Sequence, residues 1–119
     1  MKLLIVEDHA GMRSLIRELV RGVATEIREC SSGEDAVELC ADFAPDAVTM
    51  DLRLGAMSGL TAAKQILDLH PRANIIVVTQ FDHPRLRSLA AESGIRAFVC
   101  KDDLPALQTH LRSLSAPLQ

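Results

Sequence analysis

Aromatic side chains and excess charge are both scarce in this sequence. It contains no tryptophan and no tyrosine, and its phenylalanines are Phe43, Phe81 and Phe98. Single-stranded nucleic acids are held largely by stacking on aromatic rings, so a base-stacking surface is not expected. The formal net charge of −3 also gives no excess of positive charge for a nucleic-acid backbone or an acidic membrane. We therefore expect no direct binding of nucleic acid or membranes.

Long apolar runs and a regular cysteine pattern are absent too. The opening residues MKLLIV are too short for a secretory signal, and no later apolar run reaches the length of a membrane span. Cys30, Cys40 and Cys100 are odd in number, lack the spacing of a metal site and lie in or beside apolar segments. They are expected to be small buried hydrophobic residues in a reducing compartment, which predicts a cytoplasmic protein.

The 119 residues, enough for one domain, alternate between two kinds of segment. Short apolar segments, typical of strands buried on both faces, occupy residues 2–6, 46–50, 75–78 and 97–100. A more polar strand-like segment occupies residues 25–29, as expected for an edge strand. Each is followed by a segment with helical periodicity, which predicts five β-α repeats.

The helical segments carry apolar side chains on one face and start signals at their beginnings. Ser32 and Ser58 are expected N-caps, and Asp82 and Asp102 or Asp103 precede helices with a proline in the first turn. A helix over residues 33–41 is expected to bury Ala36, Val37, Cys40 and Ala41. The residues expected to face the core from the other helices are Met12, Leu15, Ile16, Leu19, Val20, Leu60, Ala63, Leu67, Leu86, Leu89, Ala90, Ser93, Leu104, Leu107, Leu111 and Leu114.

Five β-α repeats predict an α/β fold, a doubly wound parallel sheet of five strands with helices on both faces. With the polar second strand at an edge, the order 2-1-3-4-5 of flavodoxin-like folds is the natural one, and the order 3-2-1-4-5 is the alternative. The chain is expected to be one domain over residues 1–119, with SAPLQ as its end.

Polar residues stand where four of these strands end. Glu7 and Asp8 follow the first strand, Asp51 the third, Thr79 the fourth and Lys101 the fifth. Taken singly, each has an ordinary structural role: acids cap helices, threonine suits strand ends, and lysine is usually solvated. Because binding sites of open parallel sheets lie beyond the carboxyl ends of the strands, the set together predicts a functional site.

The chemistry of this set favours a hard metal ion and a phosphoryl group. Three crowded carboxylates repel one another, and the single ammonium group of Lys101 leaves a deficit of positive charge. Only oxygen ligands are on offer, so Mg²⁺ is the expected ion, with Mn²⁺ able to substitute. A carboxylate can attack phosphorus and form an aspartyl-phosphate, and Lys101 and Thr79 could then hold the phosphoryl oxygens.

On these residues the sequence resembles the receiver domain of two-component response regulators. The resemblance covers essentially the whole chain and rests on the ordered motifs IVEDH, DAVTMDLRL, VVTQFD and AFVCKDD. It implies a phosphorylation-activated switch, not a conventional enzyme. Asp51 would take a phosphoryl group from a sensor histidine kinase or a phosphotransfer protein, and the partner-binding surface would then change.

The resemblance also implies a role for each site residue. Asp8 and Asp51 would bind Mg²⁺ directly, Glu7 would act mostly through water, and the backbone carbonyl of Arg53 would complete the ligand set. Lys101 and Thr79 would hold the phosphoryl oxygens. Phe98 would be the switch aromatic, which turns inward when Thr79 moves; the alternative is a plain core phenylalanine.

Departures from the family pattern lie around the site. Gly55 stands where the family often has proline, which predicts a looser loop. Gln80 follows Thr79 where a small residue is usual, and Arg53 and Phe81 each lie two positions past a site residue. Such a bulky rim predicts slower attack by water and a longer phosphorylated lifetime.

The residue after Lys101 is Asp102, where several receiver subfamilies have proline. With EDH near the start, the chain is most similar to receivers attached to LuxR-type helix-turn-helix domains. No such domain lies within residues 1–119. We therefore expect control of transcription through a separate or removed DNA-binding output, or action through partners, and a homodimer remains open.

Other function classes fit less well. An aspartate-nucleophile phosphatase of the haloacid dehalogenase type needs an acid two residues after its nucleophile, where Arg53 stands. A nucleotide carrier needs a phosphate-cradling first loop, whereas EDHAG carries two repelling carboxylates. A degenerate receiver that binds partners without phosphorylation remains open because of Gln80. None of the histidines is assigned to catalysis, and Arg85, Arg87 and Arg96 are expected on a solvated face that could serve a partner.

Overall fold

The computed structural model describes residues 1–55 and 57–115. Most of the SAPLQ segment, which was expected to end the domain, lies outside the described residues. All strands of the described chain are parallel and form one sheet in the order β2-β1-β3-β4-β5. The predicted order 2-1-3-4-5 is therefore confirmed, and the alternative order is wrong. The strands are β1 (Lys2–Val6), β2 (Glu26–Cys30), β3 (Ala47–Met50), β4 (Asn74–Thr79) and β5 (Ala97–Cys100).

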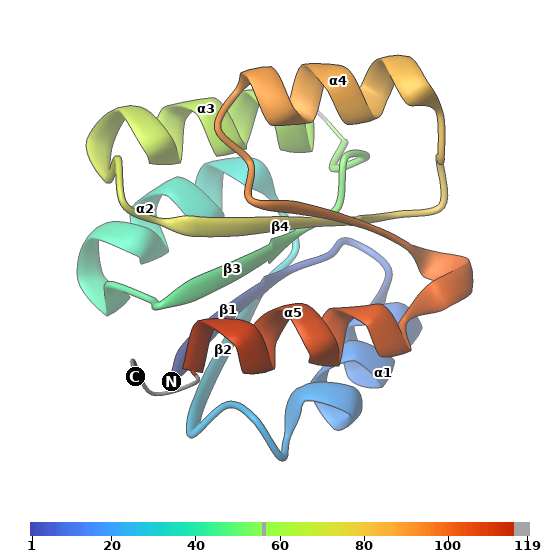
Figure 1. Cartoon of the computed structure of the whole chain (residues 1–119). Helices are drawn as coiled ribbons and strands as arrows, with labels where there is room; N and C mark the ends of the chain where they lie inside the picture. The colour runs from blue at the N-terminus through green and yellow to red at the C-terminus, as the bar shows by residue number, and fades with distance from the viewer. Residues whose placement is uncertain (56, 116–119) are drawn as a thin grey trace.

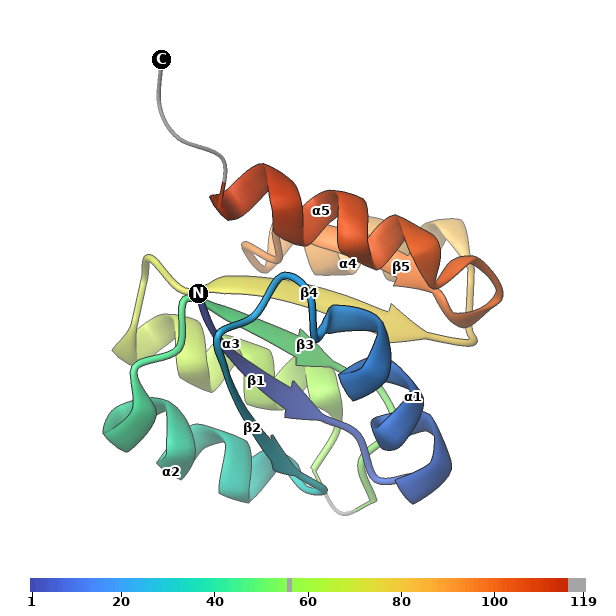
Figure 2. The same ribbon diagram turned by 90° about the horizontal axis from the view of Figure 1, so that it is seen from below.

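Helices cover both faces of this sheet (Figure 1, Figure 2). They are α1 (Ala10–Val20), α2 (Gly33–Phe43), α3 (Gly59–Leu69), α4 (Pro84–Glu92) and α5 (Pro105–Ser115), with a short 3₁₀ turn η1 (Lys101–Asp103) before α5. Helices α1 and α5 pack on one face, and α2, α3 and α4 pack on the other. None of the helices in residues 1–55 and 57–115 is long and apolar enough to cross a membrane.

The central strands are buried because their side chains alternate between two apolar layers. Leu4, Val48 and Val77 face the layer under α2, α3 and α4, whereas Leu3 and Ile76 face the layer under α1 and α5. The edge strand β2 is mostly exposed, as its alternating sequence predicted. The fold thus places the carboxyl ends of the strands along one edge of the sheet.

Three residues expected in the core lie outside it. Leu15 is 50 % exposed and Leu89 39 % exposed, and Ala41 is exposed as well. In α1 the buried stripe is centred on Ile16 and Val20, and a helical step of 100° turns Leu15 away from it. The expectation for these three residues was wrong because helical periodicity gives a face but not its width.

The helix starts agree with the sequence at two serines and differ at one aspartate. Ser32 and Ser58 are N-caps whose side chains accept from Asp35 N–H and Thr61 N–H. Helix α4 starts at Pro84, but its N-cap is His83, whose ring nitrogen accepts from the N–H of Arg85, and not Asp82. Proline at the first helical position favours this start, since it has no N–H that needs a partner.

Candidate functional site

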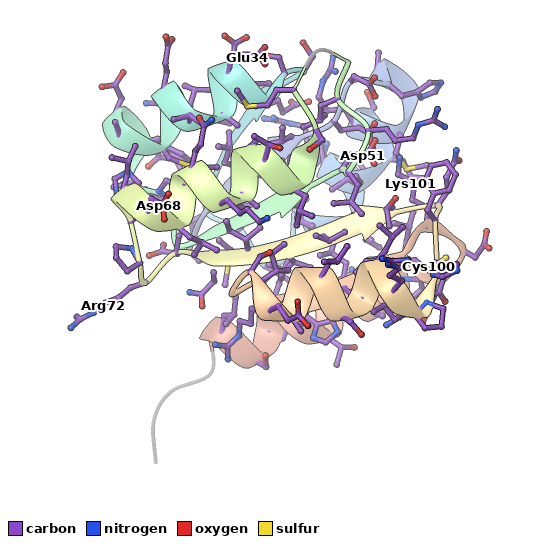
Figure 3. The ribbon with its side chains drawn as sticks, turned by 90° about the horizontal axis from the view of Figure 1, so that it is seen from above. Glu34, Asp51, Asp68, Arg72, Cys100 and Lys101 are labelled. Carbon is purple, nitrogen blue, oxygen red and sulfur yellow. The ribbon has the colours of Figure 1, made fainter. Side chains whose placement is uncertain are left out.

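The carboxyl ends of β1, β3 and β5 converge on a cavity of about 690 Å³. Its walls come from the loops that follow the strands, and they include Glu7, Asp8, Asp51, Arg53, Gln80, Phe81 and Lys101. Figure 3 shows Asp51 and Lys101 close together at this end of the sheet. The position agrees with the rule that open parallel sheets bind ligands beyond the carboxyl ends of their strands.

Three carboxylates predicted from the sequence meet in this cavity. Oxygen atoms of Glu7, Asp8 and Asp51 lie within 4.8 Å of one another. Glu7 is 1 % exposed and Asp51 is 5 % exposed, whereas Asp8 is open to solvent. Like charges this close, two of them buried, repel one another, so the arrangement favours a cation.

Lys101 places a positive charge against the buried acids. Its Nζ atom lies 2.8 Å from Oε1 of Glu7 and 3.3 Å from Oδ2 of Asp51. The remaining oxygens accept from the backbone: Oε2 of Glu7 from the N–H of His9 at 3.1 Å, and Oδ1 of Asp51 from the N–H of Arg53 at 3.3 Å. Both hydrogen bonds to Asp51 are long, so its carboxylate is only loosely held.

Burial and charge shift the titration of this pair. Burial raises the pKa of Glu7, and the negative charge of Asp51 adds to the rise, which the nearby Lys101 only partly offsets. Burial would lower the pKa of Lys101, but contact with Glu7 and the charge of Asp51 outweigh it, so the pKa of Lys101 is raised. The ammonium group therefore stays charged at neutral pH, beside a carboxylate whose ionisation is costly.

Thr79 stands behind the cavity and not in its wall. It ends β4, is 0 % exposed, and its hydroxyl oxygen accepts from the N–H of Phe81 at 3.3 Å. Within the described part of the chain the hydroxyl donates to no residue, so its proton is free for another acceptor. The structure thus brings the three acids and Lys101 together around the cavity, whereas Thr79 is not among the residues that line it.

The rim of the cavity is bulky, as the sequence suggested. The guanidinium carbon of Arg53 lies 4.9 Å from the centroid of the Phe81 ring, a cation–π distance that links the loops after β3 and β4. Gln80 is exposed beside them. Phe98 is half-buried on β5. Gly55 has a φ of +70°, which glycine adopts without strain and proline cannot adopt.

Two residues that the sequence analysis did not single out position the acids. Gly59 packs so closely that a Cβ atom there would lie 1.8 Å from the carbonyl oxygen of Asp51. Arg13 donates from Nη1 to the carbonyl oxygen of Glu7 at 2.8 Å and pairs with Glu29 on β2. The glycine that directly follows the N-cap Ser58 was a usable signal for Gly59, whereas nothing local marked Arg13.

Cys40 is buried as expected, whereas Cys30 and Cys100 are only half-buried, so the expectation of three buried cysteines was wrong for these two. Burial raises the pKa of the Cys30 and Cys40 thiols to about 11, so both stay protonated and unreactive at neutral pH. His9, next to the acids, is the N-cap of α1 and accepts from the N–H of Met12. It lies just before the first turn of α1.

The acidic cluster has the donor set of a magnesium site. All of its ligand atoms are oxygens, as Mg²⁺ requires. Oε1 of Glu7 is buried, and among the described residues it has the ion-pair contact with Lys101 but no hydrogen bond of acceptable geometry. A buried oxygen in this condition is costly, and a hydrated cation in the cavity would satisfy it.

Comparison with known proteins agrees with this geometry. A family model for the response regulator receiver domain matches residues 3–112. The chain is 32 % identical to the chemotaxis protein CheY of Thermotoga maritima over 106 residues, 88 % of each chain. It is 36 % identical to the transcriptional regulatory protein YdfI of Bacillus subtilis over 103 residues, which cover 85 % of this chain and 48 % of YdfI.

Solved structures give the same result. A LuxR-family two-component response regulator from Aurantimonas sp. SI85-9A1 matches at a TM-score of 0.89 and 27 % identity, over 96 % of this chain and 84 % of the other. A LuxR-family DNA-binding response regulator from Staphylococcus aureus matches at 0.86 and 25 % identity, over 97 % and 98 %. The chain therefore belongs to the family of response regulator receiver domains.

Proposed function

We propose that this chain is a signalling switch in which Asp51 accepts a phosphoryl group from the phosphohistidine of a sensor kinase or a phosphotransfer protein. One observation carries the proposal: the buried carboxylate of Asp51 lines the cavity, 3.3 Å from the ammonium group of Lys101 and beside the carboxylates of Glu7 and Asp8. A weakly held carboxylate among groups that balance charge is suited to nucleophilic attack.

The proposed transfer exchanges one bond for another. A carboxylate oxygen of Asp51 bonds to phosphorus while the phosphorus–nitrogen bond of the donor breaks, and the electron pair remains on the imidazole nitrogen, which takes up a proton. Lys101 can then contact a phosphoryl oxygen from its present place, and the free proton of Thr79 can be donated to another once that side chain moves forward. Water attacking phosphorus later releases phosphate and restores the carboxylate.

Asp8, Asp51 and the carbonyl of Arg53 would hold Mg²⁺, or Mn²⁺ in its place, with Glu7 acting through water. When bound, the cation would offset the charge of the acids and of the phosphoryl group. The chain's own contribution is to fix these oxygens: Gly59 seats the Asp51 loop and Arg13 holds the carbonyl of Glu7.

Phosphorylation would add a charge of about −2 at Asp51. This charge would draw Thr79 and Lys101 toward it and shift the loops that carry them, which changes the surface around α4 and β5. The name of YdfI, of which the chain spans 48 %, supports an output in transcription. The name of CheY supports an output in chemotaxis.

Intact mass spectrometry with acetyl phosphate tests the proposal. Wild-type protein with Mg²⁺ should gain ~80 Da, the mass of one phosphoryl group on an aspartate, and chelation of the metal should abolish the gain. The Asp51→Asn variant should gain nothing. Equal gains in wild type and variant would refute Asp51 as the acceptor. A gain in neither would favour a receiver that binds partners without phosphorylation.

A further inference from the structure

Helix α4 buries fewer residues than any other α-helix in the described part of the chain. Ala90 is its one fully buried residue, Leu86 is half-buried and Leu89 is 39 % exposed. Its start is joined to Thr79 by a four-residue loop over residues 80–83. The position of α4 therefore depends on that loop and on contacts made at the surface.

Arg87 connects α4 to the loop after β4 and to strand β5 through contacts at the surface. Its Nε donates to Oδ1 of Asp82 in the loop after β4, and its guanidinium carbon lies 4.6 Å from the centroid of the Phe98 ring on β5. The hydrogen bond from Arg87 lowers the pKa of Asp82 and raises the pKa of Arg87. One side chain thus joins the loop, the helix and the aromatic ring.

The strand register relates this contact to the site. Val77 pairs with Phe98, and Thr79 pairs with Cys100. The side chains of Thr79 and Phe98 therefore lie on the same face of the sheet, and their positions along the strands differ by two residues. Thr79 does not line the cavity, and its hydroxyl must move forward to reach a phosphoryl oxygen. Asp82 lies three residues beyond Thr79 in the short loop before α4, so we expect a forward shift of Thr79 to displace Asp82.

We propose that Arg87 is a positioning residue that clamps the ring of Phe98 in the unphosphorylated protein, and that the forward shift of Thr79 opens this clamp by moving Asp82 away from Arg87. The inference rests on the proposed function. It differs from the expectation that Arg85, Arg87 and Arg96 merely form a solvated face. A solvated arginine would leave the conformation of Phe98 unchanged when removed, whereas a clamp would not.

The scarcity of aromatic residues makes the clamp measurable. Protein labelled with 4-fluorophenylalanine would give one ¹⁹F resonance for each of Phe43, Phe81 and Phe98. Phe81 at the cavity rim reports occupancy of the site, Phe98 reports the clamp, and Phe43, buried near the start of β1, reports an intact fold. Beryllofluoride with Mg²⁺ serves as the phosphoryl mimic in a titration.

Arg87→Gln should move the Phe98 resonance, without any mimic, toward its position in mimic-saturated wild type. Because less must be broken on switching, half-saturation should need about two- to fivefold less beryllofluoride, the range expected from losing an exposed cation–π contact. Asp82→Asn should act in the same direction. Arg87→Lys, which keeps the charge but not the planar group, should restore only part of the wild-type behaviour.

Arg85→Gln is the matched control, since Arg85 lies two residues before Arg87, about 200° around α4, and its side chain makes no ion pair within the described residues. It should leave both the Phe98 resonance and the titration midpoint as in wild type. If Phe81 responds to the mimic but Phe98 is unmoved by Arg87→Gln, the clamp is refuted and the proposed function stands. If Phe81 fails to respond even in wild type, the proposed function fails and the clamp falls with it.

Discussion

The strand β3 has an aspartate at each end, and the two are held very differently. Asp46, before the strand, is exposed, and its Oδ2 and carbonyl oxygens accept at 2.7 and 3.0 Å from Lys2 N–H and the Asn74 side chain. Asp51, after the strand, is 5 % exposed, and the contacts of its carboxylate within the described residues, to Arg53 N–H and Lys101, are both 3.3 Å long. The exposed carboxylate thus accepts a short hydrogen bond, whereas the contacts of the buried one are long.

This difference separates a structural carboxylate from a functional one. A buried carboxylate normally needs short, complete hydrogen bonds to offset its lost hydration. Asp51 instead keeps an open side toward the cavity and lies among other acids. The amino edge of the sheet therefore contributes to stability, whereas in the function we propose the carboxyl edge gives up stability in order to bind a cation and a phosphoryl group.

The largest loss of stability is expected from adding a side chain at Gly59, which packs against the backbone of Asp51. Gly59→Ala would place a Cβ atom 1.8 Å from the Asp51 carbonyl oxygen, so the Asp51 loop must move. We expect the free energy of unfolding, measured in urea, to fall by about 3 kcal/mol or more. Gly22→Ala is the control, because nothing lies within 4 Å of a Cβ there, and it should change stability by less than about 0.5 kcal/mol.

Lys101→Met should come next, because it leaves Glu7 and Asp51 buried without their cation. At neutral pH we expect a loss of about 2 kcal/mol in the free energy of unfolding. Burial raises the pKa of Glu7 above its usual value of 4.5, so the folded protein holds the Glu7 proton more tightly than the unfolded chain does. The stability that Glu7 contributes therefore falls as pH rises from 4.5 through the raised pKa. Without Lys101 this fall deepens.

Urea unfolding as a function of pH checks the sign. Wild type and Lys101→Met should differ least at acid pH, where Glu7 is protonated, and should separate as pH rises to neutrality. In wild type the contribution of Lys101 is present at neutral pH and is lost above pH 10.5, as pH rises through its raised pKa. A constant difference at every pH would contradict the assigned pairing.

The two aspartates of β3 provide a direct test of the comparison. Asp46→Ala should lower the free energy of unfolding by about 1 kcal/mol, since it removes a hydrogen bond. Asp51→Asn, measured in a chelator, should raise it by about 1 kcal/mol because repulsion among the acids is relieved. Adding Mg²⁺ should stabilise wild type but not Asp51→Asn. Destabilisation by both variants would mean that the two edges are alike.

The smallest effect concerns the rim of the cavity. Gln80→Ala should speed loss of the phosphoryl group by about threefold, because a side chain that crowds the path of water is removed. Timing phosphate release from phosphorylated protein measures this rate. Gln65→Ala, at an exposed position on α3, is the control, and an unchanged rate in Gln80→Ala would count against a role for the rim.

The sequence predicted the β-α alternation and the strand order because each rests on a local pattern. Apolar runs such as IIVV at residues 75–78 predict buried strands, and the polar residues 25–29 predict an edge. The site followed from the same reasoning, since residues at the ends of parallel strands must share one edge. Helix faces were less certain: Leu15 and Leu89 were expected inside but are exposed, because periodicity does not give the depth of packing.

The amino-acid sequence by itself determined a five-stranded parallel sheet and the meeting of Glu7, Asp8, Asp51 and Lys101 at one edge, since strand periodicity and chain connectivity leave little other choice. Only the tertiary structure decided that Thr79 stands behind the cavity, that Gly59 touches the Asp51 backbone and that Arg87 covers Phe98. These placements depend on separations of a few ångströms between neighbouring elements, which are set by how the layers pack and which no local pattern encodes.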